Sequence, residues 1–247
     1  MRYKLHIEYD GTNFSGWQKQ KNAKTIQGTV IEAIEEVFKK NGNADKFSDL
    51  QGSGRTDSGV HAYEQVAHLE CNTFLNPELL KLKINEELPS TINIFKLEKA
   101  DDRFHARHWA KSRQYVYRIS KRRTVFERKF VWTVKDNLQV ENMQNAANIL
   151  VGMNDFSSFS EKPAKEKSTK VLIENIKITE SESFIFIRIK ASHFLWKMVR
   201  RIVGVLVEVG KDKLKQEDIK KYLDSYCPEI SVYTAPASGL FLEKVFY

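Results

Sequence analysis

The chain reads Gly52-Ser53-Gly54-Arg55-Thr56-Asp57-Ser58-Gly59 between two predicted strands, and continues as Val60-His61-Ala62. Its three glycines allow backbone angles that other residues resist. The loop is therefore able to present Arg55 and Asp57 together at a surface that a substrate approaches closely. A carboxylate displayed in this way suits catalysis. The alternative is an ordinary tight turn that leaves an Arg and an Asp in solvent.

Two better-known glycine-rich motifs do not fit this loop. A dinucleotide-binding fingerprint that begins at Gly52 needs glycine where Asp57 stands, and a phosphate-binding P-loop needs Gly-Lys-Ser or Gly-Lys-Thr at its end. A carboxylate at that position would also repel a phosphate group. The loop is therefore not predicted to bind a nucleotide cofactor.

Strands and helices alternate on both sides of the loop. Tyr3, Leu5, Ile7 and Tyr9 alternate with polar residues, which predicts a half-buried strand. Thr25 is a plausible N-cap for a helix that ends near Gly42, and Asn76-Pro77 opens a second helix toward Glu87. Further strands are predicted around Asp49 and over residues 65–71, 92–97 and 109–120.

The second half repeats this order of elements. Helices are predicted from Met143 to near Gly152, from Leu195 to near Gly210 and over residues 217–226, and strands over 171–178, 184–190 and 239–246. The helix that contains Met198 and Leu206 is the most apolar and is expected to be buried. Residues 18–24 and 161–170 are polar and predicted to be loops. Mixed strands and helices on this scale predict an α+β fold, with helices on one side of an antiparallel sheet.

Composition indicates an ordinary soluble protein of the cytoplasm. The 247 residues include 41% hydrophobic and 29% charged residues. Cys71 and Cys227 are too few for a disulfide framework and fit a reducing compartment. The apolar run from Ile202 to Val207 is far shorter than the roughly 20 residues that span a bilayer. The first six residues lack the apolar core of a signal peptide.

The net charge of +8 is concentrated in one segment. Between Arg103 and Lys129 there are ten Lys or Arg residues and one acid, Glu127, so this segment accounts for the whole excess. Five aromatic residues in the segment, and Phe130 directly after it, are interleaved with the cations, which places phosphate-neutralising groups beside rings that stack on bases. Nucleic acid is the favoured partner. The alternative is a solvated basic face.

The run Gly54 to His61 resembles the signature of the TruA family of tRNA pseudouridine synthases. Further matches follow in the same order: Glu8-Tyr9-Asp10-Gly11, Gly16-Trp17-Gln18, Phe104-His105-Ala106-Arg107, Tyr115-Val116-Tyr117, Asn154-Asp155-Phe156-Ser157-Ser158-Phe159, Met198-Val199-Arg200-Arg201-Ile202-Val203-Gly204 and Ala235-Pro236-Ala237-Ser238-Gly239-Leu240. The family more often has Ala at Ser58, a small-for-small difference. The resemblance spans nearly the whole chain.

The resemblance implies a particular architecture. Two ferredoxin-like or RRM-like halves are expected, residues 1–104 and 105–247, joined in a continuous, mostly antiparallel sheet with helices on one face. An RNA-binding cleft is expected between them. The family also implies a homodimer and a tRNA substrate, whose uridines at positions 38–40 of the anticodon stem-loop become pseudouridine.

The resemblance also assigns residues. Asp57 corresponds to the catalytic aspartate, Arg55 to the residue that enters the space left by the flipped base, and Tyr115 to the active-site tyrosine. Positive charge develops on the ribose as the glycosidic bond breaks, so an ionised carboxylate is required beside C1′. Nothing is oxidised and no atoms are lost, so neither a cofactor nor a metal is predicted. Phe194 and Leu240 are candidate apolar walls or ordinary core residues.

A guanidinium near Asp57 would keep the carboxylate ionised in a dry pocket. Arg200 interrupts the apolar helix and an arginine there usually has a partner, so Arg200 is assigned to Asp57 and Arg201 to solvent or RNA. The alternative places Arg200 on the wet side of the helix. Predicted RNA contacts come from the basic segment: Arg107, Lys111, Arg113, Arg118, Arg122 and Arg123.

Two rival functions use the same residues. A non-catalytic RNA-binding or RNA-folding protein would need the basic segment but not Asp57, and a glycosylase would release free uracil. His105 and His108 lie close enough to suggest a metal, but no third ligand accompanies them, so metal binding is not predicted. His61 is expected to support the loop by a hydrogen bond.

Overall fold

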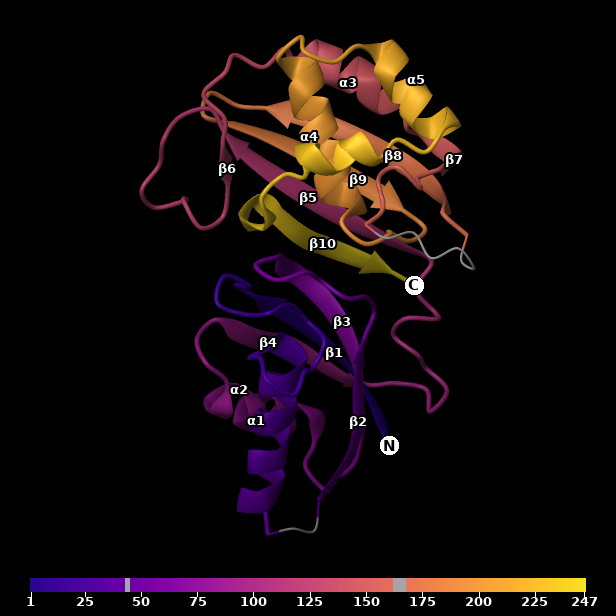
Figure 1. Ribbon diagram of the computed structural model, residues 1–247. Coiled ribbons are helices and arrows are strands. Elements are labelled where there is room, and N and C mark those ends of the chain that lie inside the picture. Colours follow the sequence, from indigo (N-terminus) through magenta and orange to yellow (C-terminus); the bar gives the residue numbers. More distant parts are fainter. Residues whose placement is uncertain (43–44, 162–167) are drawn as a thin grey trace. The chain divides into compact units, whose positions relative to one another are not determined.

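The computed structural model describes residues 1–42, 45–161 and 168–247 (Figure 1). The chain forms two compact units, one of residues Met1–Lys111 with Leu242–Tyr247 and one of residues Ser112–Phe241. Each unit combines helices with a mostly antiparallel sheet, which confirms the α+β class. The predicted halves, 1–104 and 105–247, remain a prediction about domains. Most of the predicted loop 161–170 lies outside the described residues.

The sheet of unit 1 contains β4, β1, β3 and β10 in that order, with β2 paired to β3. These strands span Ile92–Lys99, Arg2–Tyr9, His61–Asn72, Leu240–Phe246 and Lys46–Gly52. β1 is antiparallel to both β3 and β4, and Leu5 lies opposite Ala67 and Leu97. Tyr3, Leu5, Ile7 and Tyr9 are all buried, as their alternation predicts.

Two helices complete unit 1, α1 over Ile26–Lys40 and α2 over Pro77–Glu87. The Thr25 hydroxyl accepts the Gly28 N–H at 3.2 Å, and the Asn76 side chain accepts the Leu79 N–H at 2.9 Å. Both predicted starts are confirmed, because these side chains satisfy donors that a first helical turn leaves unpaired. α2 packs against α1 and β4.

The sheet of unit 2 contains β5, β9, β8 and β7 in that order, with the short β6 parallel to β5. These strands span Ser112–Ser120, Phe184–Ala191, Lys170–Glu180, Gly152–Asp155 and Trp132–Thr133. β6 and β7 were not predicted. β5 begins later than the predicted residue 109, because the chain before it turns, with the Trp109 N–H donating to the His105 carbonyl at 3.0 Å.

The helices of unit 2 are α3 (Val140–Ile149), α4 (Met198–Gly210) and α5 (Gln216–Asp224), followed by two short 3₁₀ helices, η1 (Pro228–Tyr233) and η2 (Ala237–Gly239). α4 is buried on nearly every side, as predicted. It begins at Met198 and not at Leu195, because Lys197 adopts a left-handed conformation with φ of 62°. Among the described helices none combines the length and apolar character of a membrane span.

Candidate active site

Asp57 lies in the β2–β3 loop (residues 53–60) of unit 1. Its side chain is half-buried, whereas Arg55 is exposed and Ser53, Thr56 and Val60 are buried. The loop therefore alternates between anchored and displayed residues. Arg55 and Ser58 are exposed and Asp57 is half-buried, so Arg55 and Asp57 both remain accessible, as the sequence predicts.

Backbone hydrogen bonds fix this loop to the segment that follows β1. The Trp17 N–H donates to the Thr56 carbonyl at 3.0 Å, and the Gly59 N–H donates to the Phe14 carbonyl at 3.3 Å. The Ser58 hydroxyl donates to the same Phe14 carbonyl at 3.2 Å. Residues on both sides of Asp57 are thus attached to one framework, which limits how far the carboxylate can move.

The glycines act differently from the sequence interpretation. Within the octet only Gly59 has a left-handed φ, 77°. Gly52 is needed for space, because a Cβ there would lie 2.6 Å from the Trp17 ring, whereas a Cβ on Gly54 would meet nothing within 4 Å. The expectation that all three supply unusual backbone angles is wrong.

Two glycines outside the octet have stricter requirements. A Cβ on Gly11 would lie 2.0 Å from the Val60 carbonyl oxygen, and one on Gly16 would lie 2.5 Å from the Thr56 carbonyl oxygen. Gly16 also has φ of 87°. Both belong to quoted motifs, Glu8-Tyr9-Asp10-Gly11 and Gly16-Trp17-Gln18, so the signal was present but its physical reason needed the structure.

A buried polar network supports the loop from below. Gln65 is fully buried, accepts the Ser53 hydroxyl at 2.7 Å and donates to the Gly54 carbonyl at 3.0 Å. The Tyr9 hydroxyl lies 2.8 Å from the Thr56 hydroxyl. Burial raises the pKa of the Tyr9 phenol well above its ordinary value, so this hydroxyl stays neutral. Satisfied networks of this kind rigidify the backbone above them.

His61 closes the loop at its far end. Its imidazole is buried, and Nδ1 accepts the Gly11 N–H at 3.0 Å. The Asp10 carboxylate lies 3.2 Å from the same nitrogen. Because Nδ1 accepts a hydrogen bond from a backbone N–H, its lone pair is engaged in structure, and the prediction of a supporting hydrogen bond is confirmed.

Arg55 points its guanidinium toward the preceding loop of unit 1. Its Nε donates to the Gln18 side-chain oxygen at 3.1 Å. The side chain is exposed, and within the described residues it is held by this one hydrogen bond to an uncharged amide. Such a contact is weak enough to be exchanged for another partner.

Tyr115 and Arg200 belong to unit 2. Tyr115 is buried in β5, and the Phe194 ring packs edge-on against it with 5.0 Å between centroids. Arg200 is half-buried on α4, and its Nε donates to the Ala235 carbonyl at 2.6 Å. The Ala235 N–H returns a bond of 3.1 Å to the Arg200 carbonyl. The side chain is thus held at a defined place beside the Ala235-Pro236 segment.

Tyr117 flanks the same segment. Its hydroxyl donates to the Pro236 carbonyl at 2.8 Å, and a Cβ on Gly239 would lie 2.7 Å from its ring. Burial raises the pKa of Tyr117, while the nearby Arg200 guanidinium acts in the opposite direction. Of the two tyrosines in the motif, Tyr117 therefore positions the segment that holds Arg200.

Arg201 does not face solvent, so that expectation is wrong. It is buried, forms an ion pair with Glu161, and donates to the Ser160 carbonyl at 2.6 Å. Neighbouring residues on a helix point about 100° apart. On a helix buried on most sides, that rotation turned Arg201 toward the chain at Ser158 to Glu161.

The basic segment divides into displayed and engaged cations. Arg107, Lys111, Arg122 and Arg123 are exposed. Arg113 donates to the Ser192 carbonyl at 3.0 Å, and Arg118 forms an ion pair of 2.6 Å with Glu127. The exposed four are the stronger candidates for phosphate contacts, because the other two are half-buried.

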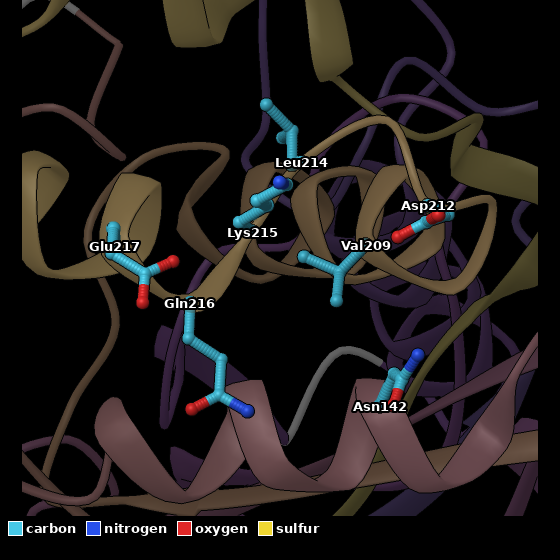
Figure 2. A pocket seen from close by; sticks show the side chains of 7 residues that line it. All are labelled: Asn142, Val209, Asp212, Leu214, Lys215, Gln216 and Glu217. Atoms are coloured by element: carbon cyan, nitrogen blue, oxygen red, sulfur yellow. The ribbon is translucent and has the colours of Figure 1, made fainter.

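His105 uses its Nδ1 to accept backbone N–H groups of Arg107 and His108, at 3.2 and 3.4 Å. In the part of the chain that the structure describes, no three His, Cys, Asp or Glu residues gather to hold a metal ion. Figure 2 shows a pocket of about 360 Å³ between α3 and the start of α5. None of the candidate residues lines it, so its volume does not mark the chemistry.

These features define a class, an α+β protein with one acidic side chain on a rigid loop and a basic, aromatic segment suited to nucleic acid. The family model described as tRNA pseudouridine synthase matches residues 6–108 and 146–247. A tRNA pseudouridine synthase A from Thermoanaerobacter sp. (strain X514) is 39% identical over 243 residues, which is 98% of this chain and 97% of the relative. The protein of that name from Ehrlichia chaffeensis is 39% identical over the full length of both chains.

A third relative of that name, from Thermodesulfovibrio yellowstonii, is 36% identical over 99% of this chain and 98% of its own length. The chain belongs to the TruA family of tRNA pseudouridine synthases. Its activity is that of an isomerase that acts on tRNA, so the two non-isomerase alternatives are set aside.

Proposed function

We propose that the protein converts uridine to pseudouridine at positions 38–40 of the tRNA anticodon stem-loop, with Asp57 as the catalytic residue. The observation that carries the proposal is the half-buried carboxylate of Asp57, attached on both sides to a rigid framework. A group fixed in this way loses little entropy when it engages a substrate.

The reaction breaks the bond from ribose C1′ to uracil N1 and forms one from C1′ to C5. The base turns between the two steps, C5 loses a proton and N1 gains one, so atoms and electrons balance without a cofactor. Asp57 faces a sugar that becomes positively charged as the first bond breaks. An ionised carboxylate either stabilises that charge or bonds to C1′.

Arg200 is proposed as the partner that keeps Asp57 ionised. Its support is the fixed position of the side chain, bonded through Nε to the Ala235 carbonyl. A guanidinium presents a planar set of donors, so anchoring one of them leaves a defined orientation for the rest. The proposal requires the two halves of the chain to meet at one RNA-binding cleft.

Arg55 and Tyr115 are proposed to handle the flipped base. Arg55 is exposed on the same loop as Asp57 and held by one side-chain bond, so it is able to enter the space that the base leaves. Tyr115 has a ring braced by Phe194, which suits a wall for the uracil.

The remaining proposals concern the setting. The proposed contacts to RNA are Arg107, Lys111, Arg122 and Arg123, which are exposed, together with the half-buried Arg113 and Arg118. The protein acts as a homodimer in the cytoplasm, and the free thiols of buried Cys71 and Cys227 fit a reducing compartment.

The test replaces the carboxylate with its neutral isostere. Asp57→Asn should lower pseudouridine formation on tRNA transcripts by roughly a thousandfold or more, the scale of single catalytic groups, because charge is lost while shape is kept. The control is Asp102→Asn, an exposed carboxylate of the same unit. Mass spectrometry maps the product, and filter binding shows that the variant still holds tRNA. Preserved turnover in Asp57→Asn would refute the assignment.

A further inference from the structure

The β5–β6 loop (residues 121–131) displays a phenylalanine to solvent at its tip. Phe126 is 92% exposed and Val125 is 66% exposed, although both are apolar. Leaving such a side chain in water forgoes the stabilisation that burial of its ring would give. Figure 1 shows the loop leaving unit 2 at the end of β5, beside β6.

The loop has a defined conformation. The Ser120 hydroxyl donates to the Arg122 carbonyl at 2.7 Å, and the Phe130 N–H donates to the Glu127 carbonyl at 2.8 Å. The Phe130 ring packs against Phe241, with centroids 6.3 Å apart. The base of the loop is therefore anchored, and the tip is presented to solvent.

Four cations lie within four residues of Phe126 in the sequence, namely Arg122, Arg123, Arg128 and Lys129. All four are exposed, and within the described residues none of them takes part in an ion pair. Their charges are therefore available to a polyanion that approaches the tip.

Glu127 is the one acid of the loop, and Arg118 neutralises it. The two side chains form an ion pair of 2.6 Å, and the Arg118 guanidinium lies 5.5 Å from the centre of the Phe241 ring. This ion pair neutralises the carboxylate that would repel a phosphate, and it also attaches the loop to β5. What remains at the tip is an apolar ring among unpaired cations.

Exposure alone does not predict a binding site, and Phe74 shows why. Phe74 is 88% exposed in unit 1, but residues 71–77 contain no charged side chain. The difference between the two phenylalanines is the cationic surround. A ring flanked by cations is the pattern of single-stranded nucleic-acid sites, in which bases stack and phosphates are neutralised.

We propose that the β5–β6 loop is a tRNA-docking element in which Phe126 stacks on an unpaired nucleobase while Arg122, Arg123, Arg128 and Lys129 contact the adjoining phosphates. The inference rests on tRNA as the substrate and not on the role of Asp57. It assigns a specific stacking residue within the basic, aromatic segment.

The experiment separates a flat ring from an apolar side chain. Phe126→Leu keeps apolar bulk but removes the π-face, and should weaken binding of full-length tRNA roughly tenfold, whereas Phe126→Tyr should bind within about twofold of the natural protein. Phe74→Leu is the matched control and should change nothing. Because Phe126 is exposed, thermal unfolding of all three variants should match the natural protein.

The kinetic pattern sharpens the assignment. Phe126→Leu should raise KM for tRNA and leave kcat unchanged at saturation, because docking is lost and the reacting groups are untouched. Binding is measured also in the Asp57→Asn background, so failure of the catalytic assignment would leave this comparison intact.

Two results would overturn the proposal. Equal tRNA affinity of Phe126→Leu and Phe74→Leu would show that no base stacks on the ring. Normal binding by Phe126→Leu, with Phe126→Ser sedimenting as a smaller species than the natural protein, would show that the loop contacts a second copy of the chain.

Discussion

The β2–β3 loop connects two strands of unit 1 and the β5–β6 loop connects two strands of unit 2, and the two loops differ in how firmly they are held. In the first, Thr56 is buried and its carbonyl is bonded to the Trp17 N–H, while Gln65 supports the backbone from inside. In the second, the tip residues Val125 and Phe126 face water, and the loop is held at its base and by the ion pair between Glu127 and Arg118.

The difference reflects two tasks. A carboxylate that stabilises a reaction centre must keep its position within a fraction of an ångström, and buried hydrogen bonds achieve that. A docking surface must only display a ring and charges that a flexible RNA can find. The β2–β3 loop should therefore be sensitive to small substitutions, and the β5–β6 loop tolerant of them.

The largest expected effect comes from one added methyl group in the rigid framework. Gly16→Ala places a Cβ 2.5 Å from the Thr56 carbonyl oxygen at a residue with φ of 87°. Steric and backbone strain together should lower the free energy of unfolding by roughly 4 kcal/mol and impair activity. Urea denaturation measures the loss.

Gly54→Ala is the control inside the same octet. A Cβ there meets nothing within 4 Å, and the residue has no left-handed φ. Stability should change by less than about 0.5 kcal/mol or rise slightly, since Ala restricts the unfolded chain. Equal stability of the two variants would contradict the rigid-framework interpretation.

The adjacent arginines of α4 extend the comparison to unit 2. Arg201→Met removes the buried partner of Glu161 and the donor to the Ser160 carbonyl, so it should cost about 3 kcal/mol, discounted because Glu161 remains partly exposed. Compared with Arg201→Met, Arg200→Met should lower the free energy of unfolding less and should lower the activity more. Chemical denaturation and turnover, measured on both proteins, give the crossed pattern.

A matching loss of stability and activity in the two variants would mean that α4 holds no specialised guanidinium. The double variant Arg201→Met/Glu161→Leu provides a check on mechanism. It removes both charges, and should recover part of the stability lost by Arg201→Met alone.

Features that depend on neighbouring residues could be predicted from the sequence alone. Thr25 and Asn76-Pro77 set the starts of α1 and α2, because capping depends only on neighbouring residues. The alternation from Tyr3 to Tyr9 identified β1, and the strongly apolar composition of α4 identified that helix as buried. The octet supplied the β2–β3 loop, its displayed residues and, through the family, the activity.

Contacts between segments that are distant in the sequence could not be predicted from it. Gly16 is required because the Thr56 backbone passes beside it, and nothing near Gly16 in sequence indicates this. On α4, the helical pattern places Arg200, Arg201 and Glu208 on one side, and it did not show that Arg201 is buried against the chain at Ser160 and Glu161. β6 is only two residues long, too short for a periodicity.

A smaller effect is expected from pH. His68 in β3 is buried, and its Nδ1 accepts the Ala106 N–H at 3.2 Å, which supports the loop that carries Arg107. Burial, with the neighbouring His105 adding to it, lowers the pKa of His68 to about 4. An unfolded histidine has a pKa near 6.5, so between these values the unfolded state binds more protons.

The free energy of unfolding should therefore fall by about 2 kcal/mol as pH drops from 7 to 5, because of the titration of His68. His68→Asn keeps an acceptor near the Nδ1 position and cannot titrate, so its unfolding free energy should vary less over the same range. Denaturation curves at several pH values measure the difference. Parallel profiles for the two proteins would show that His68 is not the group responsible.

The smallest effects compare one threonine from each loop. The Thr56 hydroxyl is buried and lies 2.8 Å from the Tyr9 hydroxyl, whereas Thr124 accepts the Glu127 N–H at 3.4 Å near the exposed tip. Thr56→Val keeps the shape and removes a buried bond, so it should cost about 1.5 kcal/mol, and Thr124→Val should cost less than about 0.5 kcal/mol because water replaces the lost acceptor. Thermal unfolding resolves such differences when both variants are measured against the natural protein. A larger loss of stability in Thr124→Val than in Thr56→Val would contradict the assignment of the β2–β3 loop as rigid and the β5–β6 loop as displayed, because the more important hydroxyl should lie in the more tightly held loop.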